Sequence, residues 1–245
     1  MSQVLNVAAY RFVELDDLAT LQATLQRRAE AAALKGTVLL ASEGINLFLA
    51  GEPTALRGWL AQLQADARFA ALEVKESFSV ALPFRRLRVR IKREIIRMNQ
   101  PTVRPAQGRA PAVDAATLAR WLHAGRCDQG REVVVLDTRN GFEVDHGGFD
   151  GAIDWRLRSF GDFPAALDTH RAELQGRTVV SVCTGGIRCE KAALWMQAQG
   201  LPHTWQLDGG ILKYFEQLPD APHWRGRCFV FDEREALDAS LKGAR

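Results

Sequence analysis

In the first part of the chain, the spacing of the hydrophobic residues switches between that of β-strands and that of α-helices. Four runs that are apolar, or alternate apolar with polar residues, predict strands: 3–12, 36–41, 45–50 and 72–80. Residues 18–29 and 53–63 carry apolar side chains at helical spacing, which predicts two helices. The order strand, helix, strand, strand, helix, strand is that of a ferredoxin-like α+β domain, which we assign to residues 1–98.

From residue 114 onward, short apolar strands alternate with helices. The runs at 133–136 and 178–182 are rich in β-branched residues, as in a parallel sheet that is covered on both faces. A third strand is predicted at 204–207, and helical spacing lies between and after these runs. The alternation predicts a parallel-sheet α/β domain over residues 114–222.

The segments beside this second domain have a different composition. Residues 99–113 contain Pro101, Pro105 and Pro111 and show no apolar periodicity, so we expect a linker. Residues 223–245 follow the last predicted helix and are expected to form a C-terminal extension.

Composition narrows the class of protein. Hydrophobic residues make up 47% of the chain and charged residues 25%, which is typical of a soluble globular protein. We expect no membrane partner, because no apolar run approaches the ~20 residues that cross a bilayer and the N-terminal residues lack the layout of a signal peptide. The irregular cysteine spacing argues against a disulfide framework and a metal site, and favours the cytoplasm. The sequence leaves the oligomeric state open. The cysteines are Cys127, Cys183, Cys189 and Cys228.

The positive charge of the chain is concentrated in one stretch. Residues 85–97 hold seven basic residues and one acidic residue, a local charge of +6, while the rest of the chain holds 25 basic and 28 acidic residues. Basic and apolar residues alternate from 87 to 92, so a strand here has one basic face. The charges either guard the edge of a sheet or bind RNA phosphates, which we favour. The candidate RNA-binding residues are Arg88, Arg90, Lys92 and Arg93.

A cysteine stands where a predicted strand turns into a helix. Cys183 follows the run 178–182, and the next helix is predicted from Glu190. The amides and the dipole of the first helical turn point at a side chain in this position. Glycines let the loop curl with its amides inward, and an arginine adds positive charge, so the thiolate is favoured. The candidate active-site loop consists of Cys183, Thr184, Gly185, Gly186, Ile187 and Arg188.

The residues of this loop favour sulfur chemistry over two other interpretations. A buried structural cysteine explains neither the glycine pair nor the arginine. A cysteine phosphatase also combines cysteine, loop and arginine, but its loop has one residue more than the six from Cys183 to Arg188. The shorter loop is better sized to hold one extra sulfur atom, as in a sulfurtransferase that carries a persulfide on Cys183.

Three further residues are candidates for a supporting role. Asp137 and Arg139 follow the strand at 133–136 and either orient a substrate or form an internal salt bridge, which we favour. Cys189 is either a thiol that resolves an oxidised Cys183 or a buried helix cysteine, which we favour.

Several blocks of the sequence resemble known proteins. CTGGIRCEK at 183–191, LDTRN at 136–140 and FDGAIDW at 149–155 resemble the blocks of rhodanese domains. Four further blocks extend the resemblance over nearly the whole chain: ASEGIN at 41–46, RVRIKREIIRM at 88–98, GGILKYFE at 209–216 and CFVFDER at 228–234. Together they resemble the rhodanese-type tRNA wobble-uridine hydroxylases, in a short form without the cysteine-rich tail that some members carry.

The resemblance implies a specific activity. It implies oxygen-dependent 5-hydroxylation of the wobble uridine of tRNA, with Cys183 indispensable and molecular oxygen as co-substrate; no other cofactor is evident. Residue chemistry alone leads more directly to sulfur transfer from a Cys183 persulfide, and this alternative stays open.

Overall fold

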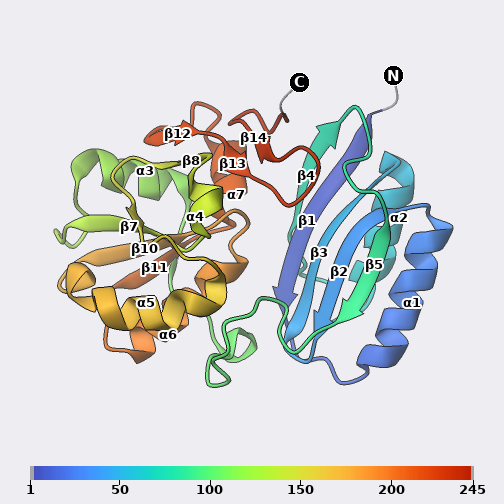
Figure 1. Ribbon diagram of the computed structural model, residues 1–245, viewed down its shortest axis with the longest axis horizontal. Coiled ribbons are helices and arrows are strands. Elements are labelled where there is room, and N and C mark those ends of the chain that lie inside the picture. Colours follow the sequence, from blue (N-terminus) through green and yellow to red (C-terminus); the bar gives the residue numbers. More distant parts are fainter. Residues whose placement is uncertain (1–2, 244–245) are drawn as a thin grey trace. The chain divides into compact units, whose positions relative to one another are not determined.

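The structure is a computed structural model that describes residues 3–243. The chain forms two compact units (Figure 1). The first unit comprises the chain up to Ile96 together with residues 231–234, and the second comprises Arg97–Val230 and the chain from Glu235 onward.

The first unit is a five-stranded sheet with two helices on one face (Figure 1). The strand order is β4-β1-β3-β2-β5; β5 is parallel to β2, and the other three pairs are antiparallel. The first four strands have the ferredoxin-like order, so the predicted α+β architecture is confirmed, and β5 adds a new edge. The elements are β1 (Val4–Phe12), α1 (Leu18–Ala31), β2 (Lys35–Ala41), β3 (Gly44–Gly51), α2 (Pro53–Gln64), β4 (Val74–Ser79) and β5 (Leu87–Ile91).

The apolar stripes of both helices pack against one face of this sheet. Leu25 of α1 and Trp59 and Leu60 of α2 are at most 5% exposed. The Asp17 side chain caps α1 by accepting a hydrogen bond from the Thr20 amide at 3.3 Å. Burial of apolar side chains therefore fixes which face of the sheet the helices cover.

Strand β5 carries the predicted basic face along an edge of the sheet. Val89 is buried beside Val38, its partner in the parallel register. Because side chains alternate along a strand, Arg88 and Arg90 lie on the opposite face, away from α1 and α2. Ile91 was predicted to join the apolar face, but it is 41% exposed, because the strand ends at this residue. The prediction is wrong at this position.

The second unit is built on a parallel sheet, as predicted, and this sheet has five strands. Its strand order is β6-β11-β10-β7-β9. Figure 1 shows α3 on one side of this sheet and α5 and α6 on the other. The strands are β6 (Ala112–Val113), β7 (Val133–Asp137), β9 (Ile153–Asp154), β10 (Thr178–Val182) and β11 (Thr204–Leu207). The helices are α3 (Ala115–Ala124), α4 (Gly141–Val144), α5 (Phe163–His170), α6 (Ile187–Ala198) and α7 (Gly210–Gln217).

Two small antiparallel pairs involve the segment after α7. β8 (Gly147–Phe149) pairs with β12 (Trp224–Gly226), and β13 (Cys228–Phe229) pairs with β14 (Ala236–Leu237). The segment 99–113, whose composition predicts a linker, contains a short 3-10 helix at Pro105–Gln107 and ends in β6. Within the described part of the chain, no helix is long and apolar enough to cross a membrane.

Candidate active site

Cys183 directly follows the central strand of the parallel sheet. Strand β10 lies between β11 and β7, and all five of its residues are buried. Ligand sites in such sheets form beyond the carboxyl ends of the strands, which is where Cys183 stands. The residue itself is fully buried. The sulfur is therefore held inside the second unit, at the edge of the sheet where chemistry is expected.

The loop after Cys183 aims backbone amides at the sulfur. Gly186 has a φ of +99°, a conformation that glycine adopts without strain, and its amide donates a hydrogen bond to Cys183 Sγ at 3.1 Å. Helix α6 begins at Ile187, three residues before the predicted start. Ile187 and Arg188, predicted as loop residues, therefore belong to its first turn, and Gly186 stands at the N-cap.

Helix α7 supports the loop by hydrogen bonds to its backbone carbonyls. The amide of Ile211 donates to the carbonyl of Cys183 at 2.9 Å, and the amide of Leu212 donates to the carbonyl of Thr184 at 3.0 Å. Gly210 has a φ of +70°, and a Cβ atom there would lie 2.5 Å from the Cys183 carbonyl oxygen. Only glycine allows this approach, so Gly210 belongs to the site although it carries no chemistry.

The environment of Cys183 favours its thiolate. Burial alone raises the pKa of Cys183, but three opposing effects outweigh it: a hydrogen bond from the Cys189 thiol, the charge of Arg188 and the backbone amides of both residues. The pKa of Cys183 therefore lies well below that of an ordinary thiol. Burial and the Cys183 thiolate both raise the pKa of Cys189, which stays protonated and serves as the donor.

Arg188 is paired with a carboxylate that the sequence analysis did not identify. Its guanidinium forms two hydrogen bonds with Glu143 of α4, at 2.6 and 2.7 Å, and the side chains are 6% and 0% exposed. The predicted positive charge is therefore largely compensated. Spacing gave no sign of this pair, because Glu143 lies 45 residues before Arg188.

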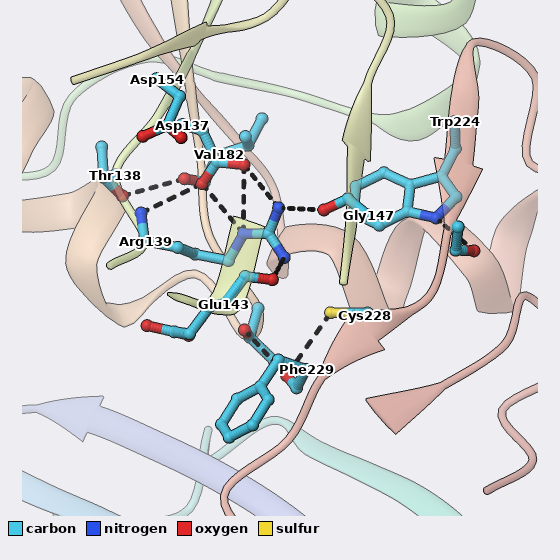
Figure 2. A network of polar contacts seen from close by, with 12 residues as sticks. Asp137, Thr138, Arg139, Glu143, Gly147, Asp154, Val182, Trp224, Cys228 and Phe229 are labelled. Carbon is cyan, nitrogen blue, oxygen red and sulfur yellow. Dashed lines mark hydrogen bonds and ion pairs between the residues drawn. The ribbon is translucent and has the colours of Figure 1, made fainter. Parts of the chain in front are cut away.

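Figure 2 shows that Asp137 and Arg139 form a buried salt bridge, as favoured. Both side chains are 0% exposed, and the closest pair of atoms, Arg139 Nη2 and Asp137 Oδ2, is 2.6 Å apart. Arg139 also donates to the carbonyl of Gly147 at 2.7 Å and lies over the ring of Trp224 at 5.4 Å. These contacts fix the loop after β7 and the start of β12, so the pair serves the framework of the site.

Thr138 connects this framework to the cysteine loop. Its amide and its hydroxyl both donate to the carbonyl of Val182, each at 2.9 Å. The same hydroxyl lies 3.9 Å from the sulfur of Cys189, which is fully buried in the first turn of α6. The preference for Cys189 as a buried helix cysteine agrees with its burial, but its thiol also contacts Cys183.

A third buried thiol lies beside the loop. Cys228 of β13 is fully buried, and burial raises its pKa to about 12 despite the nearby Arg139 charge and a hydrogen bond with Thr184. The hydroxyl of Thr184 also donates to the carbonyl of Phe229 at 3.4 Å. The sequence pattern does not reveal this position, because the place of Cys228 beside Thr184 depends on the fold of the C-terminal segment.

The described residues differ in what they offer to a metal ion and to an RNA. Residues 3–243 contain no group of three histidines, cysteines, aspartates or glutamates that could hold a metal ion. In the same range, the four candidate RNA-binding residues form no ion pair, and three of them, Arg90, Lys92 and Arg93, are exposed. They belong to the first unit and Cys183 to the second.

Comparison with known proteins identifies both units. A family model described as a UPF0176 acylphosphatase-like domain matches residues 4–95, and a rhodanese-like domain model matches residues 114–217. A tRNA uridine(34) hydroxylase of Bordetella avium is 62% identical over 239 residues, which is 98% of this chain and 98% of that protein. This chain belongs to the tRNA uridine(34) hydroxylase family.

Other members of the tRNA uridine(34) hydroxylase family are nearly as similar. The protein of Variovorax paradoxus with this name is 60% identical over 241 residues, 98% of this chain and 91% of that protein. The solution structure of a rhodanese-like domain from Anabaena is 20% identical with a TM-score of 0.38, and covers 47% of this chain and 79% of that domain. The predicted family and the two-domain fold class are confirmed by the family models and the full-length relatives.

Proposed function

We propose that this chain hydroxylates carbon 5 of the uridine at the wobble position of tRNA. The observation that carries the proposal is identity of about 60% along nearly the full length to proteins named tRNA uridine(34) hydroxylases. Molecular oxygen is the co-substrate in this proposal. The reaction takes place in the cytoplasm, where the tRNA is.

Cys183 is the reacting side chain in this proposal. Its thiolate is favoured by the Gly186 amide at 3.1 Å, the Cys189 thiol and the charge of Arg188. Gly185 and Thr184 complete the loop, and α7 holds their backbone through the carbonyls of Cys183 and Thr184. A preorganised set of donors around one sulfur stabilises negative charge without rearrangement during the reaction.

The basic edge of the first unit binds the tRNA backbone in this proposal. Arg88 and Arg90 project from the sheet face opposite α1 and α2, and Lys92 and Arg93 continue past the end of β5. Binding of these side chains to phosphates costs little free energy, because within residues 3–243 they have no ion pair with a carboxylate that must first break. Because β5 is an edge strand, the same charges would also prevent pairing with another sheet. A measurement of tRNA binding distinguishes the two roles.

Sulfur transfer is the second candidate function. The Gly186 amide points at Cys183 Sγ, and the terminal sulfur of a persulfide on Cys183 would be an anion that loop amides stabilise. Under this alternative, Cys183 would pass sulfur to an acceptor, and the wobble uridine would be thiolated or left unchanged.

The two functions are separated by the nucleosides they produce. The chain and its Cys183→Ser variant are expressed in a bacterial strain that lacks its own wobble-uridine hydroxylases, and wobble nucleosides are analysed by mass spectrometry. The proposal predicts 5-hydroxyuridine or its derivatives with the native chain and none with the variant. Cysteine-dependent thiolation would favour the second function, and unmodified uridine with the native chain would contradict the proposed hydroxylation.

A further inference from the structure

Glu143 is a buried carboxylate that neither the loop motif nor the predicted supporting residues include. It lies in the short helix α4, is 0% exposed and forms two hydrogen bonds with the Arg188 guanidinium. The amide of Asn140 donates to the same carboxylate at 3.0 Å. Burial of a charged pair is costly unless the geometry is good, and here both carboxylate oxygens are used.

Its partner Arg188 acts on the reacting sulfur in two ways. The backbone amide of Arg188 belongs to the first turn of α6 and faces Cys183, so the position of this residue sets part of the sulfur's hydrogen bonding. The charge of Arg188 also favours the thiolate. A group that fixes Arg188 and compensates its charge therefore controls both effects.

The neighbouring salt bridge shows that Glu143 has a separate task. Asp137 and Arg139 are also fully buried, and Arg139 donates to the backbone carbonyls of Gly147 and Glu143, at 2.7 and 3.4 Å, and lies over the ring of Trp224. The carboxylate of Glu143 takes no part in these framework contacts and reaches across to α6, at the residue next to Cys189. If the Glu143–Arg188 pair only stabilised the fold, removing the charge of Glu143 without unfolding the chain would leave the titration of Cys183 unchanged.

We propose that Glu143 is a positioning residue for the Cys183 thiolate and acts through Arg188. This inference rests on the proposed function, in which Cys183 is the reacting side chain. Glu143 holds the guanidinium in one place and limits how strongly its charge acts on the sulfur.

The test is Glu143→Gln, followed by NMR titration of the cysteine Cβ resonances. Glutamine keeps the size and a hydrogen-bond acceptor but removes the negative charge, so the Arg188 charge acts on Cys183 without compensation. We expect the midpoint of Cys183 to fall by about 1 pH unit and wobble hydroxylation to fall at least tenfold. A Cys183 midpoint equal to that of the native chain would overturn the proposal.

A matched control comes from the end of the same helix. Asp145 pairs with Arg156 in an exposed ion pair, at 2.6 Å, and makes no contact with α6 among the interactions described. Asp145→Asn therefore removes a carboxylate from the same segment, and we expect it to leave the Cys183 midpoint and the hydroxylation unchanged. If Asp145→Asn shifted the Cys183 midpoint as much as Glu143→Gln does, the shift would come from the net charge of this segment and not from the contact of Glu143 with Arg188.

A second variant covers the case in which Glu143→Gln does not fold. Glu143→Gln combined with Arg188→Gln leaves no unpaired buried charge. We expect the Cys183 midpoint to rise above that of the native chain, because Arg188 is the member of the pair whose charge favours the thiolate. A native midpoint in this double variant would overturn the proposal. The titration needs no tRNA, so failure of the positioning role is distinguished from failure of the hydroxylase function.

Discussion

At the scale of single residues, the site is defined by what surrounds one sulfur. Burial disfavours the Cys183 thiolate, but the Gly186 amide, the Cys189 thiol and the charge of Arg188 reverse the balance. The Arg188 guanidinium donates from Nη1 and Nη2 to the two oxygens of Glu143, so the carboxylate fixes its position and compensates its charge.

The first prediction is that Cys183→Ser abolishes wobble hydroxylation and leaves the fold intact. Serine is nearly isosteric but does not ionise near neutral pH, so the reacting thiolate is lost. Cys127→Ser, which changes another buried cysteine of the second unit, should keep the activity. Nucleoside mass spectrometry measures the activity, and thermal melting should show a loss of stability of no more than about 2 kcal/mol. Hydroxylation by Cys183→Ser would refute the role of this side chain.

The second prediction concerns pH. An acid whose folded pKa is lowered is ionised above that lower value, so the thiolate of Cys183 persists as pH falls below the ~8.5 of a free thiol and is lost only when pH falls through its own pKa. Cys228 provides an internal comparison, because burial raises its pKa to about 12. NMR titration should give a midpoint for Cys183 far below that of Cys228. A midpoint for Cys183 at or above ~8.5 would show that burial dominates.

Much of the site could be predicted at this scale, and the remainder could not for a physical reason. The strand, the glycines and the cysteine of the loop are contiguous, so their local pattern gives their geometry. Glu143, Cys228 and Gly210 reach the loop through tertiary packing alone. Gly210 carried a signal in the glycine pair at the start of α7, since consecutive glycines at a helix start indicate close approach of another backbone.

At the scale of elements, two helices and one strand hold the cysteine loop. Gly186 and the first turn of α6 supply amides to the sulfur, and α7 supplies amides to the carbonyls of Cys183 and Thr184. The sequence predicted the parallel sheet, because its buried strands are rich in β-branched residues. It did not predict β6, because a two-residue strand is too short to show a period and owes its place to pairing with β11.

The third prediction tests the support from α7. In Gly210→Ala, the new Cβ atom would lie 2.5 Å from the Cys183 carbonyl oxygen, at a φ of +70° that alanine adopts only with strain. We expect a loss of stability of about 1–3 kcal/mol and a displaced loop with reduced activity. Gly185→Ala is the matched control for stability, because its Cβ atom would meet no atom within 4 Å. Chemical denaturation measures both variants, and equal stabilities would contradict the tight packing of α7 on the loop.

The fourth prediction tests the basic edge strand. Replacing Arg88, Arg90 and Lys92 together by Gln should weaken tRNA binding and reduce the slope of log affinity against log salt by up to ~3, because up to three phosphate contacts are lost. Melting should change little, because exposed charges contribute little to stability.

The control for this prediction changes exposed cations on the other side of the same sheet. Arg27 and Arg28 lie on α1, which packs on the face away from Arg88 and Arg90. Replacing both by Gln should leave the salt slope nearly unchanged. Filter binding over a range of salt concentrations measures the tRNA affinity of each variant. If the triple variant bound tRNA as tightly as the native chain, the charges would only protect the edge of the sheet, and RNA would bind elsewhere.

At the scale of the whole molecule, charge and chemistry are divided between the two units. The basic stretch belongs almost entirely to the first unit, and the cysteine loop belongs to the second. The chain outside residues 85–97 has 25 basic and 28 acidic residues, so attraction to a polyanion comes from one stretch. This division explains why changes in β5 should alter binding, whereas changes at Cys183 should alter the reaction.

The measurement that tests the central claim most directly follows an oxygen atom. Cells that lack their own wobble-uridine hydroxylases and express this chain are grown under heavy-isotope dioxygen, and the wobble nucleosides are analysed by mass spectrometry. The account predicts that the new hydroxyl group carries oxygen from the gas, and that cells with Cys183→Ser contain no 5-hydroxyuridine. Hydroxyl oxygen derived from water, or native levels of 5-hydroxyuridine with Cys183→Ser, would contradict oxygen-dependent hydroxylation at the Cys183 loop.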